Sequence, residues 1–167
     1  YAQQVFRHVE AAHAAGMPAI ISSNEKGQRR EISWPELRRQ SSALALQLKA
    51  QGVQRGDRVA AYLPNIPEAM IALMAVASIG AIWSVCAPDM GTPAVLDRLG
   101  QITPTVLIAC DGVTYGGKDH DRLGTLAELR AGLPTLKHVL VYRNLAHAPL
   151  PADVTDWQTA IARDDAA

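Results

Sequence analysis

Hydrophobic positions in the segment 56–91 predict a strand, a helix and a second strand. The run 58–63 is almost continuously apolar, as expected of a strand buried on both faces. Apolar residues cover nearly every side of 66–78, which indicates a helix that is buried on most of its surface. Gly80 ends that helix, and 81–86 has the composition of the next strand. Two apolar strands joined by a buried helix form a βαβ unit, which favours a parallel sheet inside a larger domain.

The rest of the chain continues this alternation of helices and strands. In order, the pattern predicts a helix over 2–15, a β-hairpin from 19–22 and 30–33, a helix from Ser33 to Gly52, a helix over 92–102, a strand over 105–109, a polar loop over 111–124, a helix from Thr125, a strand over 137–142, a linker over 143–151 and a short helical stretch around Trp157. Polar residues followed by a Glu three positions later predict capping boxes at helix starts. The pairs are Ser33 with Glu36, Asn65 with Glu68, and Thr125 with Glu128. This order of elements is typical of a three-layer α/β fold with a parallel sheet.

The composition is that of a soluble globular protein. The 167 residues are 49% hydrophobic and 19% charged, which is enough chain to bury a core. Sixteen basic residues balance sixteen acidic ones, so neither nucleic acid nor an anionic membrane surface is an expected partner. The longest apolar run, 69–85, is interrupted by Ser78, Gly80 and Ser84. We therefore expect no membrane span, and the start of the chain has no signal-peptide pattern.

The residue types that carry catalysis or bind metals do not cluster in the sequence. Cys86 and Cys110 each follow an apolar strand, so we expect buried free thiols in a reducing compartment, which favours the cytoplasm. The five histidines have no metal-ligand spacing, and the patterns G-x-S-x-G and G-x-G-x-x-G are absent. The residues alone therefore indicate an α/β domain without a complete catalytic set.

Ligands of parallel α/β sheets bind beyond the carboxyl ends of the strands, and two loops at these ends are candidates. The loop 87–91 precedes a helix, whose free N–H groups attract anions, unless Asp89 or Thr92 simply caps that helix. The loop 111–118 contains a Gly-Gly pair that gives a ligand access to the backbone, followed by a lysine at its rim. Residues 112–118 partly match the phosphate-loop pattern G-x-x-x-x-G-K-[ST], although Asp119 occupies the hydroxyl position. A solvated surface loop explains the same residues.

Tracts along nearly the whole chain resemble the adenylate-forming acyl-CoA synthetases. Those similar to the N-terminal part of the superfamily are SWPEL at 33–37, GVQRGDRV at 52–59, YLPNIPE at 62–68 and SIGAIWS at 78–84. Those similar to the branch that acts on acetoacetate and acetate are AIWSVCAPDMG at 81–91, VLDRLGQI at 95–102 and DGVTYGGK at 111–118. The resemblance implies an α/β fold: a three-layer, parallel-sheet subdomain of the N-terminal domain of an adenylate-forming enzyme, with an N-terminal β-hairpin.

The resemblance also implies a two-step ligase reaction with small-molecule substrates. ATP and a carboxylic acid first give an acyl-adenylate and diphosphate, and the thiol of coenzyme A (CoA) then displaces AMP. The implied acid is acetoacetate, or another short-chain acid such as acetate, and the implied metal is Mg²⁺. Position within the motifs implies a CoA site formed by Ala87, Pro88, Asp89, Tyr115, Gly116, Gly117 and Lys118. No catalytic or metal-binding residue of the family is matched in the chain.

In the resemblance, residues 1–167 form part of an N-terminal AMP-binding domain and end before the family's phosphate loop. The implied parts are a helix and hairpin over 1–33, a βαβ core over 34–142, and a linker with the start of a further segment over 143–167. We expect such a piece to be inactive alone and to self-associate through uncovered sheet edges. A stand-alone nucleotide-binding protein that uses the loop 112–118, and a non-catalytic interaction domain of flavodoxin-like shape, are the alternatives.

Overall fold

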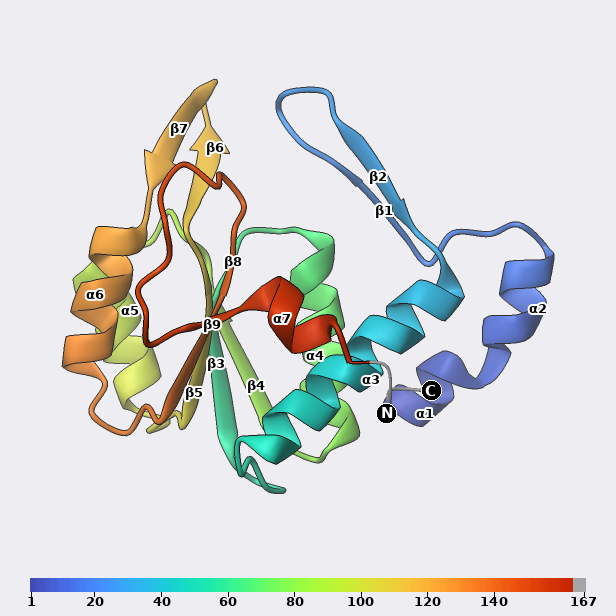
Figure 1. Ribbon diagram of the computed structural model, residues 1–167, viewed down its shortest axis with the longest axis horizontal. Helices are drawn as coiled ribbons and strands as arrows, with labels where there is room; N and C mark the ends of the chain where they lie inside the picture. Colours follow the sequence, from blue (N-terminus) through green and yellow to red (C-terminus); the bar gives the residue numbers. More distant parts are fainter. Residues whose placement is uncertain (164–167) are drawn as a thin grey trace.

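Five parallel strands form the central sheet of the computed structural model, which describes residues 1–163 (Figure 1). The strands are β3 (Arg58–Tyr62), β4 (Ile82–Cys86), β5 (Val106–Cys110), β8 (His138–Tyr142) and β9 (Thr155–Asp156). Their order across the sheet is β4-β3-β5-β8-β9, and all neighbours are parallel. The predicted parallel α/β sheet is confirmed. Because the chain passes from β4 back across β3 to β5, the direction of strand addition reverses there, and such a switch point is where open α/β sheets bind ligands.

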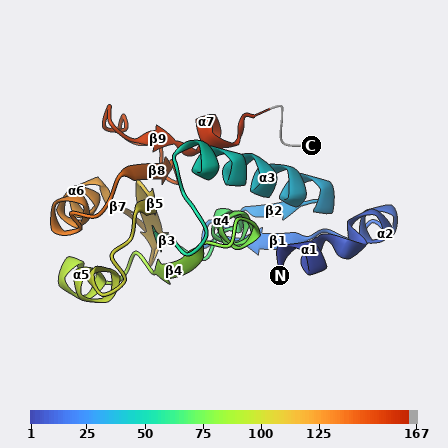
Figure 2. The same cartoon turned by 90° about the horizontal axis from the view of Figure 1, so that it is seen from below.

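Helices cover both faces of the sheet and make the fold three-layered (Figure 2). One face packs against α3 (Trp34–Ala50), α4 (Pro67–Ser78) and α7 (Trp157–Ile161), and the other packs against α5 (Thr92–Gly100) and α6 (Leu123–Gly132). Alternate residues of one strand enter the two cores: Val59 and Ala61 lie on the α3 side, and Ala60 and Tyr62 lie on the α5 side. This two-residue alternation explains why β5 is apolar at every position and why β3 is apolar after Arg58.

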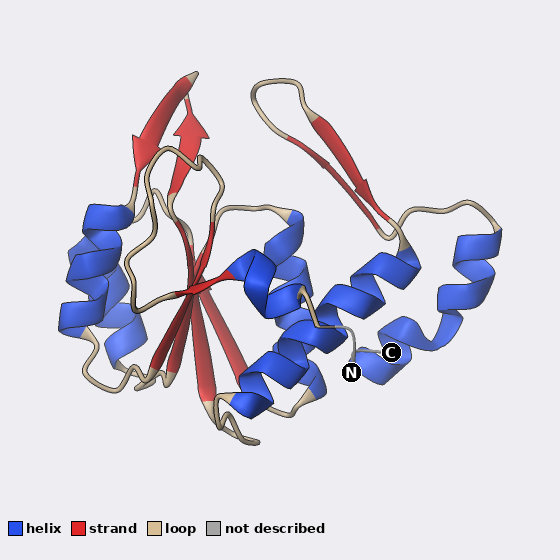
Figure 3. Ribbon diagram, in the orientation of Figure 1, coloured by secondary structure: helices blue, strands red, loops and turns tan. Residues whose placement is uncertain are grey.

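The N-terminal segment forms short helices and a hairpin beside the core (Figure 3). The helix predicted over 2–15 is divided into α1 (Ala2–Val5), the 3₁₀ turn η1 (Phe6–His8) and α2 (Val9–Ala14). The predicted hairpin is confirmed as β1 (Ile20–Ser23) paired with β2 (Arg29–Ile32). The hairpin is separate from the parallel sheet and lies near the carboxyl ends of the sheet strands.

The segment 111–124 is a second hairpin, so its prediction as a loop was wrong. Strand β6 (Gly112–Tyr115) pairs antiparallel with β7 (Lys118–Asp121). The two residues between them, Gly116 and Gly117, have φ angles of +60° and +73°. Two-residue hairpin turns with positive φ at both positions match the twist of the strands, and glycine adopts them at no steric cost. The Gly-Gly dipeptide is the signal that the interpretation as a loop overlooked.

The predicted capping boxes were wrong in part. Ser33 does cap α3, since its hydroxyl accepts a hydrogen bond from the backbone N–H of Glu36 at 3.3 Å. The Glu36 carboxylate, however, pairs with the guanidinium of Arg39 at 2.7 Å, which lowers the pKa of Glu36. The side chain of Asn65 makes no capping bond at α4. Thr125 lies inside α6, whose first turn is instead bonded by the Asp121 carboxylate.

The cysteines and the sheet edge bear on the remaining expectations. Both cysteines are buried free thiols, as predicted, and burial raises the pKa of Cys110 to about 12.

Strand β4 is an edge of the sheet, and its Ile82 and Val85 are 50% and 47% exposed. Self-association through this edge stays a prediction. The cytoplasmic location also stays a prediction. Strand β9 was not predicted, and residues 164–167 of the expected terminal segment lie outside the described residues. Among residues 1–163, no helix is both long and apolar enough to cross a membrane.

Candidate functional site

A polar pocket of about 520 Å³ lies over the carboxyl ends of the sheet strands. Its walls come from the β1–β2 hairpin, from 64–66 after β3, from 113–114 in β6, and from the last residue of β8 and the segment 144–147 after it. The pocket therefore lies at the switch point between β3 and β5, where the topology places a ligand crevice. Its position follows from the order of the strands, which the local sequence pattern does not reveal.

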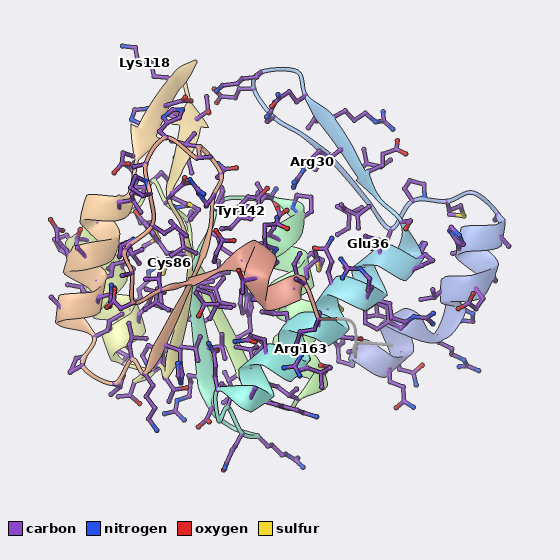
Figure 4. All side chains as sticks on the ribbon, in the orientation of Figure 1. Arg30, Glu36, Cys86, Lys118, Tyr142 and Arg163 are labelled. Atoms are coloured by element: carbon purple, nitrogen blue, oxygen red, sulfur yellow. The ribbon has the colours of Figure 1, made fainter. Side chains whose placement is uncertain are left out.

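A partly buried ion pair borders one side of this pocket (Figure 4). Arg30 extends from β2 toward Tyr142, the last residue of β8. Its guanidinium bonds both oxygens of Glu68, at 3.0 and 2.8 Å, and the Tyr142 hydroxyl at 3.0 Å. The Glu68 side chain is only 7% exposed. Burial, followed by the charge of Glu68, raises the pKa of Tyr142, so its hydroxyl stays protonated. The pair ties the hairpin to the start of α4.

A second buried carboxylate shapes the wall of the pocket after β8. Asp111 follows β5 and is 2% exposed. It accepts hydrogen bonds from the backbone N–H groups of Asn144, Leu145 and Ala146, at 2.7, 2.9 and 2.7 Å. Ala146 has a φ of +55°, a conformation that non-glycine residues seldom adopt. The carboxylate therefore holds the segment 144–146 in a turn that its sequence does not favour.

Gly112 lies where the β6–β7 hairpin meets this turn, with no space for a side chain. A Cβ atom at this position would lie 2.5 Å from the carbonyl oxygen of His120 and 2.5 Å from Cδ1 of Leu145. Gly112→Ala is therefore expected to lower the free energy of unfolding by about 1.5 kcal/mol, because one contact is with backbone that cannot move alone. Urea denaturation measures the change.

The matched control is Gly124→Ala in α6, where a Cβ would meet nothing within 4 Å. Alanine favours helix more than glycine, so this substitution is expected to leave stability unchanged or raise it by about 0.5 kcal/mol. Equal losses in the two variants would show that the close approach at Gly112 does not limit stability.

The first predicted CoA loop, Ala87 to Asp89, is held from beneath by buried and basic side chains. The Tyr62 hydroxyl lies 2.9 Å from the carbonyl oxygen of Pro88, and Arg122 Nε donates to the same oxygen at 2.8 Å. Helix α5 begins after this loop with Gly91 at its N-cap, so neither Asp89 nor Thr92 caps it. The Thr92 hydroxyl instead bonds Glu128 of α6. The backbone of the loop is thus fixed while Asp89 remains exposed.

The second predicted group, Tyr115 to Lys118, forms the outer end of the β6–β7 hairpin. Tyr115 is 71% exposed, and Lys118 points away from the sheet into solvent (Figure 4). No residue of either predicted group is among the described residues that line the 520 Å³ pocket. Arg122 connects the two groups, because it directly follows β7 as the N-cap of α6 and its side chain bonds the carbonyl oxygen of Pro88. Within residues 1–163, no three His, Cys, Asp or Glu side chains gather into a group that could hold a metal ion.

The fold, with its crevice at the strand ends and its Gly-rich hairpin, matches a known class of enzyme. Residues 6–166 match the family model described as AMP-binding enzyme, and the chain belongs to that family. Several of its relatives are acetoacetyl-CoA synthetases. The protein from Macaca fascicularis is 39% identical over 141 residues, which are 84% of this chain and 20% of the relative. The protein from Rhizobium meliloti is 50% identical over 103 residues, which are 62% of this chain and 16% of the relative.

A solved structure supports the same relationship. The acetoacetyl-CoA synthetase from Streptomyces lividans superposes with a TM-score of 0.91 at 45% identity, over 98% of this chain and 25% of that one. The predicted fold class and the predicted family are thereby confirmed. The chain spans about a fifth of the length of the curated relatives that it matches.

Proposed function

We propose that this chain is the part of an acetoacetate–CoA ligase that contacts CoA. The observation that carries the proposal is the similarity to acetoacetyl-CoA synthetase over 98% of the chain at 45% identity. In the proposed reaction, an acetoacetate oxygen attacks the α-phosphorus of ATP and diphosphate leaves. The CoA sulfur, having lost its proton, then forms a bond to the acyl carbon, and the bond from that carbon to the AMP oxygen breaks. The described residues offer no metal cluster, so no step is assigned to Mg²⁺ on this chain.

The proposed contribution of the chain is to bind the phosphates of CoA. Gly116 and Gly117 carry no side chain at the hairpin turn, so a phosphate can approach their backbone N–H groups. Lys118 adds a positive charge at the same turn, and its exposed position leaves it free to follow a ligand. The loop 87–89, fixed by Tyr62 and Arg122, supplies a rigid second contact. These are binding roles, and the chemistry takes place elsewhere in the ligase.

Reversal of the charge at Lys118 tests the proposed site. In the protein at its natural full length, Lys118→Glu is expected to raise the KM for CoA about ten-fold, because it replaces an attraction to phosphate with repulsion. Formation of the acyl-adenylate, measured by exchange of labelled diphosphate into ATP, is expected to stay unchanged. The matched control is Lys137→Glu, an exposed lysine next to the amino end of β8. An equal fall in adenylate formation, or an equal KM effect in the control, would contradict the assignment.

A further inference from the structure

The turns of the two hairpins touch each other across the polar pocket. Glu25 Oε2 in the β1–β2 turn accepts a hydrogen bond at 3.0 Å from the backbone N–H of Gly117 in the β6–β7 turn. Next to it, Lys26 Nζ lies 3.1 and 3.4 Å from the two carboxylate oxygens of Asp119. The partners are 92 and 93 positions apart in the sequence. We call these four residues the hairpin clasp; both hairpins lie at the same end of the parallel sheet (Figure 1).

The clasp engages an atom that the proposed CoA site needs. The N–H of Gly117 belongs to the glycine turn, whose open backbone is the feature suited to a phosphate. Carboxylates and phosphates are both anions that accept hydrogen bonds from backbone N–H groups. A carboxylate on this N–H therefore occupies the donor that a phosphate of CoA would use, and its negative charge repels a phosphate that approaches Lys118.

The second half of the clasp keeps the first in place. Asp119 accepts a hydrogen bond from the Thr114 hydroxyl at 2.6 Å and lies 3.4 Å from His147 Nε2. The Thr114 bond, followed by the contact with Lys26, lowers the pKa of Asp119 and keeps it ionised. Lys26 is thereby anchored to the strand β7, and Glu25, the residue before it, stays beside Gly117. Each contact is exposed, so the clasp is weak enough to open.

We propose that Glu25 is an internal competitor for the phosphate position at Gly117, and that CoA binds when the hairpin clasp opens. The inference rests on the CoA site proposed above and adds the regulation of that site. While the clasp is closed, Gly117 donates to Glu25. When it opens, Gly117 and Lys118 together face the incoming phosphate. The apparent affinity for CoA then equals the intrinsic affinity multiplied by the fraction of molecules with an open clasp.

Removal of the Glu25 charge tests the proposal in the protein at its natural full length. Glu25→Gln keeps the size of the side chain but removes its negative charge. It is expected to lower the Kd for CoA, measured by isothermal titration calorimetry, by about three- to ten-fold, because the open fraction rises. The Kd for pantetheine, which carries no phosphate, is expected to stay unchanged. The matched control is Glu31→Gln on the same hairpin, where the carboxylate pairs with Arg29 and lies outside the clasp.

The outcomes separate this inference from the function that it depends on. A weaker or unchanged affinity for CoA in Glu25→Gln, relative to Glu31→Gln, overturns the competitor role while the Lys118→Glu result still supports the site. Equal tightening in both glutamate variants overturns it as well, because that result would reflect overall charge. If Lys118→Glu leaves CoA binding intact, the proposed site itself is wrong, whatever Glu25→Gln does.

Discussion

Replacement of Asp111 with asparagine is expected to lower the free energy of unfolding by about 3 kcal/mol, because each hydrogen bond to a buried charged group contributes about 1.5 to 3 kcal/mol. The carboxylate accepts from three backbone N–H groups and is almost fully buried. An asparagine side chain has one acceptor oxygen, and its NH₂ group would face an N–H donor. Urea denaturation followed by circular dichroism measures the loss.

Asp57→Asn is the control for this experiment. The Asp57 carboxylate accepts one backbone N–H bond, from Gln54 at 2.8 Å, at an exposed turn. Water can replace a partner there, so the expected loss is below about 1 kcal/mol. Similar losses in the two variants would mean that the network around the segment 144–146 does not stabilise the fold.

Removal of the Arg30 charge is expected to have the second largest effect. Arg30→Met leaves Glu68 charged and buried without its partner, a type of change that costs about 3 to 5 kcal/mol in a fully buried pair. The Arg30 side chain is 42% exposed, so solvent screens part of this penalty, and we expect a loss of about 2 kcal/mol. The double variant Arg30→Met with Glu68→Gln is expected to recover most of it, because no buried charge remains.

Arg29→Met is the matched control, on the same strand. Arg29 pairs with Glu31 at 2.6 Å, and both side chains are more than half exposed. Exposed ion pairs contribute little, so the expected loss is below about 0.5 kcal/mol. A double-mutant cycle between positions 30 and 68 that shows no coupling would refute the structural role of the partly buried Arg30–Glu68 pair.

The sequence pattern was sufficient for the elements that local chemistry determines. The βαβ unit from β3 to β4, the first hairpin and the apolar strand β5 all follow from apolar runs bounded by turn residues. The second hairpin was missed because its strands are only four residues long and β7 is polar, with Lys118, Asp119 and Asp121 among its residues. Only the Gly-Gly turn indicated it, and the same glycines also suit a ligand loop.

Capping is where tertiary contacts overrode local preference. Glu68 has the spacing of a capping box, yet its carboxylate pairs with Arg30, which lies 38 positions earlier in the chain. Glu128 likewise bonds Thr92 of α5 instead of the start of its own helix. A buried ion pair or a contact between helices competes with a cap for the same oxygen atoms. A pattern four residues long contains no information about that competitor.

The candidate site was predictable only in part, for the same reason. Residues 87–89 and 115–118 came from motif resemblance, and their role in CoA binding stays a proposal. Glu25 and Lys26 looked like ordinary turn residues of a surface hairpin. Their contact with Gly117 and Asp119 depends on how the β1–β2 hairpin stands over the sheet. No local pattern in a single sequence indicates the orientation of the β1–β2 hairpin relative to the sheet.

The order of the strands also determines how the sheet grows while the chain leaves the ribosome. Of the five strands of the parallel sheet, β3 emerges first and β4 pairs with it, which completes one border of the sheet early. Each later strand, β5, β8 and finally β9, must add to the opposite side, so growth proceeds in a single direction. Until residue 147 has emerged, the polar pocket at the carboxyl ends of the strands lacks its last wall. Ligand binding in the pocket would therefore report that the segment up to residue 147 has folded, rather than only the first βαβ unit.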